Sequence, residues 1–172
     1  MKSITRIIIC ITCICIATTA IAQELPRKVQ NIAIEDHNNN KTYIPEWGKK
    51  SLLIFYVDPE VPNQNSEVVD YIESTECIVS PNIRGLGIVN LKDTVYPNWL
   101  VRKIANARTA KNGATILYDT NHHISKAWKL GDCDNIFVTI LVNKSGELIY
   151  YYKGKMSKSE QQRFLSVAQT LM

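Results

Sequence analysis

The sequence lacks a strong excess of charge of either sign. Among its 172 residues, 20 are Lys or Arg and 16 are Asp or Glu, which gives a formal net charge of +4 with the charges scattered along the chain. Nucleic-acid-binding domains concentrate positive charge on one face, so we expect no nucleic-acid partner. Hydrophobic residues make up 45% and charged residues 21% of the chain, and these ordinary values exclude a disordered or collagen-like protein.

A long hydrophobic run is missing except at the start of the chain. Lys2 and Arg6 are followed by a mostly apolar segment from Ile7 to Thr19 and then by Ala20-Ile21-Ala22. This pattern predicts a secretory signal peptide over residues 1–22, cleaved after Ala22, because the apolar run is short for a bilayer span. An uncleaved anchor is the alternative. Residues 23–172 are then expected to form one periplasmic or secreted domain with no stable membrane span.

Cysteine is scarce beyond this leader, where only Cys77 and Cys133 remain. Two widely separated cysteines are not the framework of a disulfide-rich scaffold. Beyond the leader, metal-binding spacings such as H-x-x-x-H, H-E-x-x-H and C-x-x-C are absent as well. We therefore expect no metal site and no cofactor.

Short apolar runs alternate with helical patterns in the rest of the chain. Loose alternation on either side of Asn38-Asn39-Asn40 predicts a hairpin, and the apolar run Ser51–Val57 predicts a central strand. Strands expected over 86–91 and 114–118 are separated by helical patterns, so they should pair in parallel, whereas 136–142 and 148–152 form a hairpin closed by Gly146. Ser157 opens a capping box before a last helix.

This order of elements predicts an α/β protein: a thioredoxin-like mixed β-sheet flanked by helices, with an N-terminal β-hairpin extension. Trp99 and Trp128 lie on apolar helical faces, so we expect both in the core. Strand alternation places Tyr150 and Tyr152 on one face of the sheet and Tyr151 on the other.

Loops that leave the carboxyl ends of parallel strands meet at one edge of such a sheet, where ligands usually bind. Four polar segments should gather there: 58–63, 90–94, 119–123 and 131–135. The candidate residues of this ligand or partner edge are Asp58, Pro59, Glu60, Asn63, Asp119, His122, Asp132 and Cys133.

Thiol chemistry in this fold needs a cysteine at the start of the helix after the first central strand, where its pKa falls. The corresponding segment, Asp58 to Asn65, contains no cysteine. Two-cysteine oxidoreductase and peroxidase mechanisms therefore lose their nucleophile, and we assign no catalytic residue. The residue immediately before Ile136 is not a proline either, so the cis-proline that thioredoxins usually carry at this position is missing.

The second half of the chain resembles the YtfJ family of secreted, thioredoxin-like bacterial proteins. The resemblance is carried by Val89-Asn90-Leu91, the strand between Asn112 and Asp119, Ala127-Trp128-Lys129-Leu130, Val142 to Gly146, and the approach from Tyr152 to Met156. It implies a periplasmic location and the fold above, and it implies no activity.

Several alternatives remain for the polar edge. Cys133 is either a lone reactive thiol or, beside Asp132 and Asp134, an unreactive one. Asp58 and Glu60 are either an acid–base pair or helix-capping groups. His122 with nearby carboxylates could assist a metal-dependent reaction.

We therefore expect a redox-inactive protein that binds an envelope protein or peptide, without a disulfide between Cys77 and Cys133. The alternatives are a single-thiol or metal-assisted enzyme at the edge around Asp58, His122 and Cys133, and a structural role in an envelope complex.

Overall fold

The computed structural model describes residues 24–172, so the predicted signal peptide and its cleavage site after Ala22 lie outside the described residues. A mixed sheet has the strand order β1-β8-β7-β4-β5-β6-β2-β3. Its strands are β1 (Arg27–Lys28), β2 (Ile34–Glu35), β3 (Lys41–Thr42), β4 (Ser51–Val57), β5 (Ile83–Asn90), β6 (Ile116–Asp119), β7 (Phe137–Val142) and β8 (Glu147–Lys153). The helices are α1 (Ser66–Thr75), α2 (Asn98–Asn112), α3 (His123–Ala127) and α4 (Lys158–Gln169).

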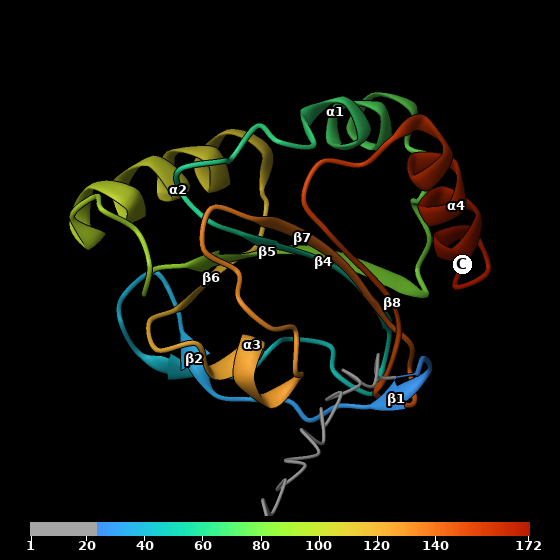
Figure 1. The fold of residues 1–172 in the computed structure, drawn as a ribbon, viewed down its shortest axis with the longest axis horizontal. Helices are drawn as coiled ribbons and strands as arrows, with labels where there is room; N and C mark the ends of the chain where they lie inside the picture. Colours follow the sequence, from blue (N-terminus) through green and yellow to red (C-terminus); the bar gives the residue numbers. More distant parts are fainter. Residues whose placement is uncertain (1–23) are drawn as a thin grey trace, which may run out of the picture.

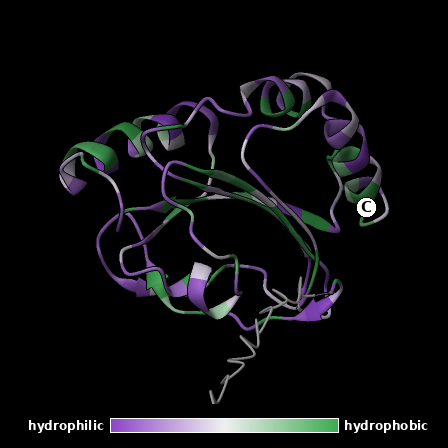
Figure 2. Ribbon diagram, in the orientation of Figure 1, coloured by the Kyte–Doolittle hydropathy of each residue, from purple (hydrophilic) through white to green (hydrophobic). Residues whose placement is uncertain are grey.

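Strand β4 lies in the interior of the sheet, parallel to β5 and antiparallel to β7. Its continuous apolar sequence fits this place because side chains on both of its faces are covered. Helices α1, α2 and α4 cover one face of the sheet, and α3 with the N-terminal segment covers the other (Figure 1). Figure 2 shows hydrophobic residues concentrated along the central strands. The thioredoxin-like α/β fold expected from the sequence is confirmed.

Each face of the sheet has its own hydrophobic cluster. On the α3 side, Trp128 packs with Ile54, Tyr56 and Ile140, whereas Leu53, Val68 and Phe164 pack on the side of α1 and α4. Tyr150 and Tyr152 belong to the α1 and α4 side and Tyr151 to the α3 side, as strand alternation predicts. The two faces therefore keep separate sets of core residues.

The N-terminal hairpin is present but extends the sheet in a way that hydrophobic alternation does not indicate. Strand β2 pairs with β3 and also, antiparallel, with β6. The carboxylate of Glu35 in β2 accepts hydrogen bonds from the hydroxyl of Thr120 and from Arg102 of α2. These contacts fasten the hairpin to the border of the sheet. The other border is formed by β1, which no hydrophobic pattern in the sequence predicts.

The prediction for Trp99 is wrong, whereas that for Trp128 is confirmed. Trp128 is fully buried, but Trp99 is 68% exposed. Helix α2 buries Val101 and Ala105, which are four residues apart and therefore share one face. Trp99 precedes Val101 by two residues, about 200° around the helix, so it projects away from the sheet.

The residue at the N-cap position of α1 bonds to another part of the chain and not to its own helix. Asn65 stands at the N-cap position, but its side chain makes no capping bond. Its Nδ2 donates to Gly154 O at 2.9 Å, and its Oδ1 accepts from Met156 N at 2.9 Å. Asn65 therefore ties α1 to the segment that leads into α4. At the start of α4, Ser157 caps the helix by accepting from Glu160 N.

In residues 24–172, none of the helices has the length and apolar content that a membrane crossing requires.

Candidate functional site

The four polar segments expected at the carboxyl edge of the parallel strands are linked by hydrogen bonds. Asn135 N donates to Asp58 Oδ2 at 3.2 Å, joining the loop before β7 to the end of β4. Val95 N donates to Glu60 Oε1 at 2.7 Å, joining the loop after β5 to the loop after β4. His122 Nε2 lies 2.6 Å from Asp93 Oδ2, which joins the loop after β6. The four loops form one continuous edge.

Asp58 and Glu60 form a compact pair directly after β4. Asp58 is fully buried, and its Oδ1 accepts from Glu60 N at 3.0 Å. Because α1 begins at Ser66, Asp58 closes the turn that follows β4 and does not cap the helix. The capping interpretation of this carboxylate is therefore wrong.

Burial and the neighbouring Glu60 raise the pKa of Asp58 to about 7. Burial also acts to raise the pKa of Glu60, but hydrogen bonds from Asp58, Val95 and Thr94 outweigh it and lower that pKa. No N–H or O–H among the described residues pairs with Glu60 Oε2, which is buried. The two pKa values shift in opposite directions, so near neutral pH Asp58 holds a proton more readily than Glu60 does.

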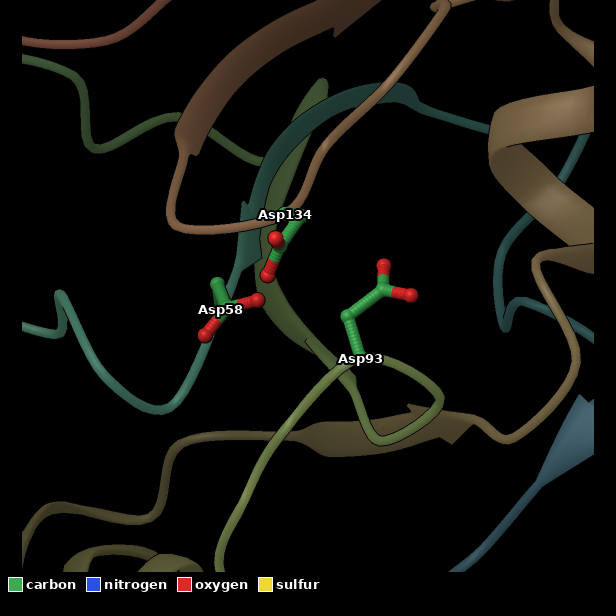
Figure 3. A group of neighbouring side chains, drawn as sticks. All are labelled: Asp58, Asp93 and Asp134. Carbon is green, nitrogen blue, oxygen red and sulfur yellow. The ribbon is translucent and has the colours of Figure 1, made fainter.

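Two further carboxylates stand beside Asp58 (Figure 3). Oxygen atoms of Asp58, Asp93 and Asp134 all lie within 4.8 Å of one another. Burial acts to raise the pKa of Asp93, but Asn90 and His122 outweigh it and lower that pKa. Carboxylate oxygens are the donors that Mg²⁺, Ca²⁺ and Mn²⁺ prefer. Both oxygens of Asp58 already accept backbone N–H groups, and its raised pKa disfavours the charged form that a metal ligand needs.

Asp119, at the end of β6, has a structural role at this edge. It is fully buried, and its carboxylate accepts from His123 N at 2.7 Å, from Ile124 N at 2.9 Å and from the Tyr56 hydroxyl at 3.3 Å. These bonds hold the start of α3 against the sheet. Asp119 is therefore occupied and does not face an incoming ligand.

The remaining candidate residues are at or near the edge, with different degrees of exposure. Pro59 is half-buried between Asp58 and Glu60, whereas Asn63 and Asp132 are exposed. His122 is half-buried and lines a groove of about 390 Å³ between α3 and the loop from Gly131 to Cys133. Asp93 and Asp134, which complete the carboxylate cluster, are not among the predicted site residues, although both lie in loops that the sequence assigns to this edge.

Cys133 lies under this groove as a buried thiol. It is 2% exposed, and burial raises its pKa to about 11, with Asp132 adding to the rise and Lys153 opposing it. Its Sγ donates to Gly131 O at 3.4 Å. A protonated, buried thiol is a poor nucleophile, and this disfavours the single-thiol enzyme.

We expect iodoacetamide to alkylate Cys133 at least about tenfold more slowly than Cys77 in the native protein, because Cys133 is buried and Cys77 is only half-buried. Peptide mass spectrometry over time measures both rates, and labelling in denaturant provides the control in which the difference disappears. Faster labelling of Cys133 would contradict the expectation. The same peptides, mapped without reductant, test the predicted lack of a disulfide between these two cysteines, which pack on opposite faces of the sheet.

Comparisons with known proteins bear on the fold. No protein-family model matches the chain, and no curated protein matches it. Among solved structures, a putative thioredoxin from Neisseria meningitidis superposes with a TM-score of 0.59 at 18% identity, over 83% of this chain and 89% of that one. A thioredoxin-family thiol:disulfide interchange protein from Chlorobium tepidum gives 0.57 at 14% identity, over 86% and 99%.

A third similar structure is the exposed lipoprotein thioredoxin Etrx1 of Streptococcus pneumoniae, with a TM-score of 0.58 and 11% identity over 80% of this chain and 99% of that one. Identities this low carry information about architecture alone. Together with the mixed sheet and its flanking helices, they show that the chain has a thioredoxin-like fold.

Proposed function

We propose that this chain is a secreted or periplasmic, redox-inactive thioredoxin-fold protein that binds a protein or peptide at the edge formed by the loops after β4, β5 and β6 and before β7. The observation that carries the proposal is the segment between β4 and α1. Asp58 and Glu60 lie in this segment, where thiol chemistry in this fold requires a cysteine. The scaffold is retained while the nucleophile is missing.

Three features support the parts of this proposal. The leader pattern of residues 1–22 favours export, and one structural neighbour is described as an exposed lipoprotein. The resemblance to the YtfJ family, carried by motifs in the second half of the chain, fits the same location. We propose that the chain is related to that family. An edge joined by hydrogen bonds between four loops offers a firm surface for a partner.

Reduction of insulin by dithiothreitol tests the redox part. We expect the purified protein to leave the rate at that of the blank, because neither Cys77 nor Cys133 lies between β4 and α1 and Cys133 is buried. Aggregation of the released insulin B chain is followed by turbidity, with a two-cysteine thioredoxin as the positive control. Acceleration comparable to that control would overturn redox inactivity.

A further inference from the structure

An exposed apolar patch adjoins the carboxylate edge at the start of α2. It consists of Val95, Tyr96 and Trp99, which are 84%, 47% and 68% exposed; we call these three residues the aromatic patch. Large apolar groups left in water next to one another mark interaction surfaces more often than isolated ones do. Trp and Tyr are also the side chains that most often dominate the binding energy of protein interfaces.

The aromatic patch and the carboxylates belong to one surface. The backbone N–H of Val95 donates to Glu60 Oε1 at 2.7 Å, and the hydroxyl of Thr94 donates to the same oxygen at 2.9 Å. Trp99 follows Val95 by four residues, in the first turn of α2. A peptide segment of a partner that covers the aromatic patch therefore lies next to the loop that contains Glu60.

Negative charge predominates beside the aromatic patch. Glu60 binds the backbone of Val95, and the carboxylate oxygens of Asp93 and Asp134 lie within 4.8 Å of one another. The cations near Asp93 are Lys92 and the paired His122. Other cations stand around Asp132: Lys126 and Lys129 line the groove with it, and Lys153 donates to its backbone carbonyl. A partner with acidic side chains would be repelled here, whereas a basic one gains charge-assisted hydrogen bonds.

We propose that the partner presents an extended segment in which Arg or Lys neighbours apolar residues, the apolar side chains covering the aromatic patch and the cation meeting the carboxylates of Asp93 and Asp134. This inference rests on the proposed binding function and specifies the chemistry of the partner. The guanidinium of Arg suits the site best, because it bonds carboxylates in two-point fashion and stacks on an aromatic ring such as that of Trp99.

Three capped six-residue peptides with two leucines each test the proposal: one carries two arginines, one carries glutamates in their place, and one carries glutamines. Binding to ¹⁵N-labelled protein is measured from the amide shifts of the loops 58–63 and 90–96. We expect the arginine peptide to bind at least about tenfold more tightly than the glutamate peptide, and to weaken at 0.5 M salt.

Trp99→Ala should weaken binding of the arginine peptide at least about fivefold, and Asp134→Asn about twofold to threefold. Ile104→Ala is the matched control, because Ile104 is 64% exposed on the same helix but about 140° around it from Trp99, and it should leave binding unchanged. All three side chains are exposed, so these variants keep the fold.

The outcomes separate this inference from the proposed function. Equal binding of the three peptides, tighter binding of the glutamate peptide, or no effect of Trp99→Ala would overturn the inference while leaving an edge that binds peptides. If none of the three peptides shifts the loop amides, both the inference and the proposed binding function fail.

Discussion

Replacing Trp128 by alanine is expected to lower the free energy of unfolding by about 3–5 kcal/mol, the usual cost of truncating a fully buried Trp or Phe. Trp128 is 0% exposed within the cluster on the α3 side. Its ring stands 5.8 Å from that of Trp47, and its Nε1 donates to Gln30 O at 2.8 Å. The substitution would leave a cavity under α3 and deprive Gln30 of its hydrogen-bond donor, and the surrounding side chains can fill that space only in part.

Trp99→Ala is the matched control, because it makes the same chemical change at a 68% exposed position. We expect it to change the free energy of unfolding by less than about 0.5 kcal/mol. Urea unfolding followed by circular dichroism measures both variants without depending on tryptophan fluorescence. A loss below about 1 kcal/mol for Trp128→Ala would contradict the role assigned to this side chain.

Asp58 is expected to make the protein less stable as the pH rises from 4 to 8. The pKa of its carboxyl group is about 7 in the folded chain, compared with 3.8 for the unperturbed group. The folded state therefore holds a proton that the unfolded state releases, and the stabilisation present below pH 4 is lost as the pH passes 7. Each pKa unit corresponds to about 1.4 kcal/mol. The lowered pKa of Glu60 acts in the opposite direction only near and below its ordinary value of 4.5, at the acidic end of this range. We therefore expect a net loss of stability of up to about 4 kcal/mol.

Asp58→Asn should remove most of this dependence, because an amide stays neutral over the whole range. Asp134→Asn, at an exposed carboxylate of the same cluster, should keep the slope of the wild-type protein. Urea unfolding at intervals of one pH unit measures the slopes. Parallel profiles for Asp58→Asn and the wild-type protein would contradict the raised pKa of Asp58.

Most of the fold could be predicted from the sequence because its signals are local. The apolar run Ser51–Val57 coincides with β4, and Gly113, in the left-handed conformation, ends α2 where the Asn-Gly pair predicts an end. The loops of the carboxyl edge follow from the order of strands and helices. By contrast, β1 has only two residues and no local pattern that predicts a strand. It forms because it pairs with β8, which is distant in the sequence.

The details of the site could not be predicted, because they depend on which side of a loop or helix each side chain faces. Asp93 and Asp134 lie in the predicted loops, but only the folded chain brings their oxygens beside Asp58. The exposure of Trp99 depends on the rotation of α2 about its axis, which the contacts of Val101 and Ala105 with the sheet determine. The raised pKa of Asp58 likewise depends on its complete burial.

The borders of the sheet have a consequence for behaviour at high concentration. The outermost strands, β1 and β3, are two residues long. The hairpin formed by β2 and β3 pairs with the outer side of β6. A foreign strand can add to a sheet only where several unpaired main-chain groups lie in a row. These short terminal strands offer few such groups, which protects the protein from fibril-like association with its own copies.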